Sequence, residues 1–245
     1  MNSTIDMPKA KSPSPQFLKP LMIGVASLVL LAIGGLAYIW FSGGTGQPSM
    51  VTTAPALVLQ PGDTRTMFEI VPDESEVRFS IDEMLVGNPK TVVGTTQEVA
   101  GEILVDFDAP AASQMGTIRI NVRTLETDNE FRNRALRGQI LQAEQDQFEF
   151  AEFVPTQLIG LPDAVVIGKE FSFQIKGNLT VHGVTRDVTF DASITPTSKT
   201  QITGSAHAAV LYGDFGMSIP EAPGVANVSD EVQLEIDFVA ETAQA

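Results

Sequence analysis

Apolar and polar residues alternate along most of the chain from Phe68 onward, and this pattern constrains the fold more than any other feature. A period of two places successive side chains on opposite faces of a strand, so it predicts strands that bury one face. The alternation is longest in residues 171–181 and 184–194, which a His182-Gly183 turn joins into a predicted β-hairpin. Other runs with inward apolar residues lie at Val77, Phe79 and Ile81, at Ile103, Val105 and Phe107, at Ile118, Ile120 and Val122, between Ile202 and Tyr212, and between Val232 and Ala240.

One stretch departs from the alternation and has a helical pattern. Asp128 and Asn129 are suited to cap a helix, and Gly138 weakens its second half. The apolar face of this helix is short and consists of Phe131, Ala135, Leu136 and Ile140. About eight antiparallel strands with one short helix indicate a barrel or a sandwich, and closure into a barrel removes exposed strand edges. The sequence therefore predicts an all-β antiparallel barrel.

The N-terminal part of the chain contains a long apolar run at residues 21–41, without a single charged side chain. At a rise of about 1.5 Å per residue, a helix of this length crosses a hydrocarbon core of about 30 Å. Lys9, Lys11 and Lys19 precede the run, whereas the next basic residue after it is Arg65. Because positive charge stays on the cytoplasmic side, the N-terminus is predicted to lie inside.

These features divide the chain into four predicted parts: a cytoplasmic tail at 1–20, a transmembrane helix at 21–41, a flexible linker at 42–66 and a β domain at 67–241. A cleaved signal peptide is the alternative interpretation of the apolar run, although the run exceeds the usual 7 to about 15 residues. Either alternative exports the domain. The predicted location is the cytoplasmic (inner) membrane, with a single pass and the domain on the extracytoplasmic or periplasmic side.

Composition and charge exclude several functions. With 15 basic and 30 acidic residues the net charge is −15, which opposes a phosphate backbone and argues against nucleic acid as a partner. The chain has no cysteine, so it can form no disulfide, thiolate nucleophile or cysteine-bound metal centre.

Catalytic and metal sites have little support in the sequence. No nucleophile elbow, Walker loop, dinucleotide fingerprint or zinc-protease motif occurs. There are 2 histidines, His182 at the predicted turn and His207 on the outward face of its strand, whereas a metal site usually needs more converging ligands. We therefore predict no enzyme activity, no catalytic residue, no metal and no resident cofactor.

The inward face of the predicted strands is almost free of charge, with Arg186 near a turn as the exception. One strand presents Gly204, Ala206 and Ala208 in succession on that face, and small residues leave volume. A barrel of about eight strands is just wide enough for side chains or for one small ligand. In the alternative, phenylalanines opposite fill this volume and the core is dry, and the residue pattern leaves both open.

Several stretches of the β domain together resemble the YceI-like family. They are FEIVPDESEVRF at Phe68 to Phe79, LETDNEFRNRAL at Leu125 to Leu136, GNLTVHGVTR at Gly177 to Arg186, DFGM at Asp214 to Met217 and VSDEVQLEIDF at Val228 to Phe238. Their order and spacing match along essentially the whole domain, and the hairpin at 177–186 is the most specific of them.

The resemblance implies an extended lipocalin-like barrel of about eight strands that holds a long isoprenoid chain, such as a polyprenyl lipid or a quinone tail. It implies neither catalytic residues nor a metal. The ligand-binding residues predicted from strand parity and family position are Phe79, Ile103, Ile120, Phe150, Phe173, Leu179, Phe190, Ala206 and Tyr212, with Phe215 and Met217 near a mouth.

Two positions differ from the family's pattern. The family usually has an arginine ahead of the Asp-Phe-Gly segment, where this sequence has Tyr212, and a proline where this sequence has Asp146. A tyrosine offers a hydroxyl but no positive charge, which favours a neutral ligand such as a quinone over an anionic phosphate headgroup. Members of the family are mostly exported by cleaved signals, so an uncleaved anchor is a further variation.

The leading hypothesis is a binding protein, attached to the membrane through residues 21–41, that holds an isoprenoid lipid for storage, shielding or transfer. A homodimer is left open. The alternative is a dry structural or protein-interaction domain of the cell envelope, and an enzyme acting on lipid is a third hypothesis.

Overall fold

The computed structural model describes residue 34 and residues 46–242. The predicted tail at 1–20, nearly all of the predicted transmembrane helix at 21–41 and the start of the linker lie outside these residues. In the described part of the chain, no helix is both long enough and apolar enough to cross a membrane. The anchor and its orientation therefore stay predictions.

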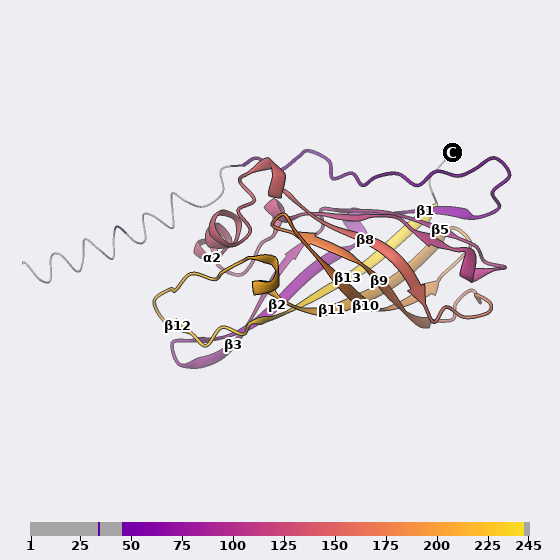
Figure 1. The fold of residues 1–245 in the computed structure, drawn as a ribbon. Helices are drawn as coiled ribbons and strands as arrows, with labels where there is room; N and C mark the ends of the chain where they lie inside the picture. The colour runs from indigo at the N-terminus through magenta and orange to yellow at the C-terminus, as the bar shows by residue number, and fades with distance from the viewer. Residues whose placement is uncertain (1–33, 35–45, 243–245) are drawn as a thin grey trace, which may run out of the picture. The chain divides into compact units, whose positions relative to one another are not determined.

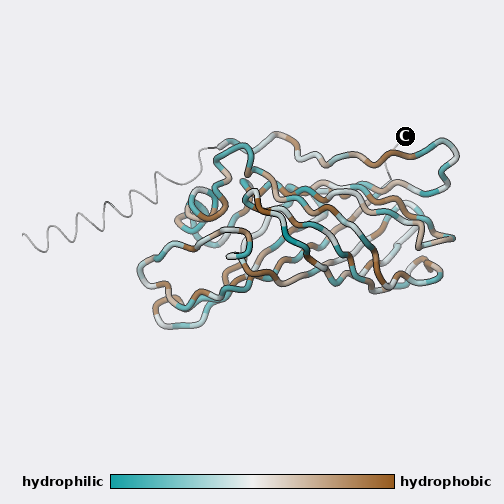
Figure 2. Tube along the Cα trace, in the orientation of Figure 1, coloured by the Kyte–Doolittle hydropathy of each residue, from teal (hydrophilic) through white to brown (hydrophobic). Residues whose placement is uncertain are grey.

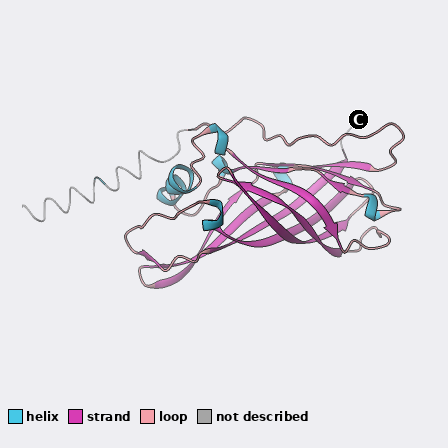
Figure 3. Cartoon of the chain, in the orientation of Figure 1, coloured by secondary structure: helices cyan, strands magenta, loops and turns pink. Residues whose placement is uncertain are grey.

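A single antiparallel sheet makes up most of the described chain (Figure 3). Its 13 strands are β1 (Thr66–Ile70), β2 (Glu76–Leu85), β3 (Asn88–Thr96), β4 (Val99–Ala100), β5 (Glu102–Val105), β6 (Gln114–Met115), β7 (Ile118–Asn121), β8 (Phe150–Ile159), β9 (Phe171–Val181), β10 (Val184–Pro196), β11 (Gln201–Leu211), β12 (Val225–Ala226) and β13 (Glu231–Thr242). The helix α2 (Glu130–Ala135) continues into a π-helical turn, η4 (Leu136–Ile140). Short 3₁₀ turns are η1 (Pro72–Glu74), η2 (Pro110–Ala112), η3 (Val122–Thr124), η5 (Asp146–Phe148) and η6 (Tyr212–Phe215).

The strand order shows that the sheet curls back on itself. The path runs β4-β7-β8-β9-β10-β11-β13-β1-β5-β6, and β2 joins it beside β13. Only Gly101 separates β4 from β5, so the pairings lead around to the segment from which they start. The predicted all-β antiparallel fold is confirmed. The expected number of strands stays a prediction, because several of the 13 strands are short.

The predicted long hairpin consists of β9 and β10, which pair without a break from the turn to Ile194. His182 has a φ of 51° and Gly183 a φ of 73°. Two successive positive φ angles form the kind of turn whose twist matches that of paired strands. The hairpin prediction is confirmed.

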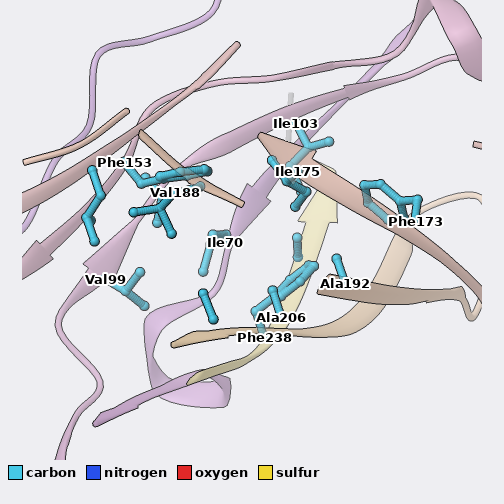
Figure 4. Close-up of a cluster of buried hydrophobic side chains, with 14 of the residues drawn as sticks. Ile70, Val99, Ile103, Phe153, Phe173, Ile175, Val188, Ala192, Ala206 and Phe238 are labelled. Atoms are coloured by element: carbon cyan, nitrogen blue, oxygen red, sulfur yellow. The ribbon is translucent and has the colours of Figure 1, made fainter. Parts of the chain in front are cut away.

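The alternation of the sequence becomes the two faces of the curled sheet, and hydropathy changes from residue to residue along the strands (Figure 2). Inward apolar side chains from many strands form one large buried cluster. Figure 4 shows part of this cluster, including Phe153, Phe173, Ile175 and Phe238. The core therefore lies inside the curl.

The predicted helix is present but short. The side-chain oxygen of Asn129 accepts hydrogen bonds from the backbone N–H groups of Phe131 and Arg132, as expected of an N-cap. After the 6 residues of α2 the chain continues as η4, whose Leu136 is buried, whereas Phe131 is 45% exposed. Of the predicted apolar face, Leu136 therefore packs in the interior, whereas Phe131 lies at the surface.

Residues 46–65, called the arm below, run beside the curled sheet before β1 (Figure 1). The sequence predicts a flexible linker here. Three hydrogen bonds join the arm to the sheet and its connections. Ser49 N–H donates to Glu149 (2.7 Å) and the Thr52 hydroxyl donates to Glu98 (2.9 Å). In the opposite direction, the Arg119 guanidinium of β7 donates to the Thr53 carbonyl (3.0 Å). The described part of the predicted linker is therefore held against the domain.

Candidate binding cavity

An internal cavity of about 270 Å³ lies inside the curled sheet. Nearly all of its lining side chains are apolar, and they come from most of the long strands. Among those labelled in Figure 4 are Ile103, Phe153, Phe173, Ile175 and Ala206. Walls with so few hydrogen-bonding groups disfavour ordered water and suit an apolar guest.

The cavity extends toward both ends of the curled sheet. At one end it is lined by Leu136 and Leu141, in and after η4, and by Met217. At the other end it is lined by Leu161 and Val165, in the loop between β8 and β9. Strand β8 connects these ends, and at about 3.3 Å per residue it is roughly 30 Å long. A small volume drawn out over this length fits a thin chain better than a compact molecule.

Ten of the eleven residues predicted from the sequence line the cavity: Phe79, Ile103, Ile120, Phe173, Leu179, Phe190, Ala206, Tyr212, Phe215 and Met217. Phe150 is not among the lining residues. The Cζ atom of Arg119 lies 5.1 Å from the centroid of its ring, and the neighbouring Ala151 lines the cavity instead. The inward phase of β8 is set by Ala151 and Phe153, one residue away from the phase that the sequence prediction assumed. Binding by the ten residues stays a prediction.

The small residues of β11 leave less room than their size suggests. Ala206 lines the cavity, whereas Gly204 and Ala208 do not. A Cβ atom on Gly204 would lie 2.8 Å from the ring of Phe238 and 2.7 Å from the Ser193 carbonyl. The Phe238 ring therefore fills the volume beside Gly204, and the open space adjoins Ala206.

Few polar side chains reach the cavity. The Tyr212 hydroxyl donates to the Asp230 carboxylate at 3.4 Å. Burial, and then the negative charge of Asp230, raise the pKa of Tyr212, so its hydroxyl stays protonated at neutral pH. Arg78 also contributes to the lining, but Glu235 and Asp237 engage its guanidinium at 3.2 Å and 2.7 Å. These groups offer a bound molecule a neutral hydroxyl and a cation that is already paired.

Neither histidine lines the cavity. His182 packs on Phe148, with 4.8 Å between ring centroids, and both of its ring nitrogens are buried without a hydrogen-bond partner. His207 is exposed on the outer face of β11. Within residues 46–242, no cluster of three or more His, Cys, Asp or Glu side chains could hold a metal ion.

Arg123 connects the arm to the segment that closes one end of the cavity. Its side chain is 5% exposed, and its guanidinium donates to the carbonyls of Gln47 in the arm and Ala143 after η4. Glu149, whose side chain is 7% exposed, pairs with Arg123 at 3.0 Å and accepts from Ser49 N–H. Burial opposes ionisation of Glu149, but the bonds from Ser49 and the other neighbours keep its pKa below the ordinary value. The alternation places Arg123 on the outer face, and no local pattern predicts this long-range pair.

Comparison with known proteins identifies the domain. A family model described as the YceI-like domain matches residues 68–240. A search of curated proteins gave no match.

Three solved structures have a similar fold. BcnA from Burkholderia cenocepacia is 17% identical, with a TM-score of 0.55 over 69% of this chain and 98% of that one. A polyisoprenoid binding domain from Saccharophagus degradans, implicated in plant cell wall breakdown, is 13% identical, with a TM-score of 0.54 over 71% and 98%. The YCEI protein of Campylobacter jejuni is 19% identical, with a TM-score of 0.50 over 62% and 85%. At these identities the similarity shows the fold alone.

Proposed function

The chain belongs to the YceI-like family, and from this membership and its cavity we propose that it holds an isoprenoid lipid inside the curled sheet. The protein would store, shield or transfer the lipid. The observation that carries the proposal is the elongated cavity of about 270 Å³ with almost wholly apolar walls. The polyisoprenoid binding domain from Saccharophagus degradans, which has a similar fold, supports this choice of guest.

A neutral lipid, such as a quinone with an isoprenoid tail, fits the lining better than one with a phosphate headgroup. A phosphate needs cationic or other strong donors. Tyr212 is neutral, and Glu235 and Asp237 already neutralise Arg78.

We also propose that the protein is a binding protein without catalytic activity and is attached to the cytoplasmic membrane through residues 21–41. The support is the uncharged apolar run and the lysines before it. The β domain would then lie on the extracytoplasmic or periplasmic side, in an extended barrel of about eight strands.

A dry domain of structural or protein-interaction function is the second candidate. The observation that favours it is the Phe238 ring, which fills the space beside Gly204. In such a domain the remaining void would be a packing defect without a guest.

Organic extraction of the purified full-length chain, followed by mass spectrometry, separates these candidates. The proposed function predicts about one isoprenoid lipid for each protein molecule after repeated washing. Preparations from native membranes that carry no such lipid would favour the dry domain.

A further inference from the structure

Building on the function proposed above, we infer that one end of the domain is its membrane-facing surface and the port through which lipid enters. This surface is the segment of residues 129–143, called the cap below, which contains α2 and η4. The partner that it fits is the headgroup region of a lipid bilayer.

The cap is the wall between solvent and one end of the cavity. Leu136, Ile140 and Leu141 of the cap line the cavity directly. The cap also contributes to a small apolar cluster that is separate from the main core and includes Leu136, Leu141 and Ala143. This cluster also includes Ala151 of β8, but the cap contains no strand, so it can move without opening the strand pairs of the sheet. A lipid that passes the cap therefore enters the cavity lengthwise.

The length of chain before the arm selects this end of the domain. Gly46 lies against Arg123 and the carbonyl of Glu144, just after the cap, at distances of 2.9 Å and 3.1 Å from a Cβ built on it. The predicted membrane run ends at residue 41. Five residue steps reach at most about 18 Å. A tether of this length keeps the cap end close to the bilayer, whereas the other end of the cavity, about 30 Å away along β8, is under no such constraint.

Charge distribution favours the same surface. Without Lys9, Lys11, Lys19 and Asp6, the totals of 15 basic and 30 acidic residues become 12 and 29, a net charge of −17 for the exported part. The cap itself contains three arginines, Arg132, Arg134 and Arg137, and one acidic residue, Glu130, which is a net charge of +2. Arg132 is paired with Glu83 and Asp128, which lie outside the cap. The excess of negative charge is therefore carried by the remainder of the domain. An anionic bilayer repels the cap least.

The cap also displays an apolar aromatic side chain, of the kind that interfacial helices insert at the boundary between headgroups and acyl chains. Phe131 is 45% exposed on α2. The arm adds Met50, which is 99% exposed and directly follows Ser49, whose N–H donates to Glu149. The opposite end has exposed apolar residues too, with Val166 at 55%, so exposure alone does not choose between the ends. A test must compare the two directly.

The absence of cysteine allows a clean test in the full-length chain. Phe131→Cys and Val166→Cys would each be labelled with an environment-sensitive fluorophore and placed in nanodiscs of phosphatidylcholine and phosphatidylglycerol that contain nitroxide-labelled lipid. We expect quenching at position 131 to exceed that at position 166 several-fold. Equal quenching at both positions, or stronger quenching at 166, would overturn the assignment of the cap. Glu130→Cys provides a second cap position if Phe131→Cys does not fold.

Lipid extracted from the same preparations keeps this outcome separate from the proposed function. An isoprenoid lipid bound to protein whose cap is not quenched would overturn the membrane-facing cap and leave the lipid-binding function standing. A quenched cap on protein without any such lipid would overturn the port and the lipid-binding function, while the contact with the bilayer would stand.

Discussion

At the scale of single residues, removing one partner of the buried pair Arg123–Glu149 is expected to cost more stability than breaking any other described ion pair. Both side chains are below 10% exposed. Arg123 also donates hydrogen bonds to Gln47 in the arm and to Ala143 at the end of the cap. Arg123→Gln leaves the Glu149 carboxylate buried and short of a partner, which costs about 3 to 5 kcal/mol. Lys90→Gln removes a pair with Asp128 that is largely open to solvent and should cost less than about 1 kcal/mol. Urea denaturation of both variants measures the difference, and equal midpoints would contradict the central role of Arg123.

The two histidines provide a second prediction about residues. Neither touches the cavity, and His182 makes no hydrogen bond through its ring nitrogens. His182→Ala and His207→Ala should therefore leave the amount of extracted lipid per protein unchanged. Loss of lipid from a variant that still folds, as judged by circular dichroism, would reopen a metal or catalytic role.

The residues that line the cavity show which positions the sequence predicts correctly and which it does not. Strand parity and family position place ten of the predicted residues on the cavity wall, because alternation fixes a face once the phase is known. Phe150 fails because η5 ends just before β8, and nothing in the local pattern sets the phase of the first strand residue. Ala151, which lies between Phe150 and Phe153, is too small to indicate from the sequence that it faces the interior.

At the scale of elements, the arm depends on ionised Glu149. Burial raises the pKa of Glu149, but the hydrogen bonds from Ser49 and Asn121 and the positive charge of Arg123 together hold it below its ordinary value. A carboxylate with a lowered pKa stabilises the native state above its unfolded pKa, about 4.3, and this contribution is lost as pH falls through the lower folded pKa. Acid should therefore release the arm in the wild type.

Glu149→Gln should release the arm already at neutral pH. We expect backbone amides of residues 47–53 to exchange with deuterium at least about tenfold faster than in the wild type, equivalent to about 1.4 kcal/mol. Asp191→Asn serves as the matched control, since the Asp191 carboxylate accepts a hydrogen bond from Gln174 on the neighbouring strand and not from the arm. Unchanged exchange in Glu149→Gln would show that other contacts hold the arm.

The arm is also the element that sequence patterns describe least well. Its Gly, Pro, Ser and Thr content is typical of a flexible coil, and its attachment depends on partners about 45 to 100 positions away, such as Glu102 and Glu149. Leu104 shows this on the sheet, because it is only 1% exposed although alternation places it on the outer face together with Glu102. Glu102 accepts a hydrogen bond from Leu57 N–H in the arm, so this outer face of β5 is covered.

At the scale of the whole molecule, the first prediction concerns attachment. The part of the chain after residue 41 is too acidic to adhere to anionic lipid by charge, so the proposed membrane attachment depends on the apolar run at 21–41. The full-length protein should sediment with membranes and stay there after washing with high salt, which screens surface charge. Immunoblotting of the washed fractions measures this. A soluble form beginning near residues 45 to 55 would indicate cleavage and remove the anchor.

The last prediction concerns whether the domain is hollow, and two alanines of β11 provide a test variant and a matched control. Ala206 and Ala208 both face inward and are both buried, but only Ala206 adjoins the cavity. A phenylalanine at 206 places its ring in existing volume and buries new apolar surface, worth about 25 cal/mol per Å². A phenylalanine at 208 meets packed atoms, and such overpacking costs about 1 to 3 kcal/mol.

A hollow, lipid-binding domain therefore gives opposite signs for the two substitutions. Delipidated Ala206→Phe should be as stable as the delipidated wild type or more so, while its extracted lipid falls sharply. Ala208→Phe should lose stability, and its remaining folded fraction should keep its lipid because the cavity wall is unchanged. Denaturation midpoints of the delipidated proteins and lipid per protein provide both readings. If Ala206→Phe loses more than about 1 kcal/mol, as Ala208→Phe is expected to, and the wild type carries no lipid, the core is dry and binding is the wrong function.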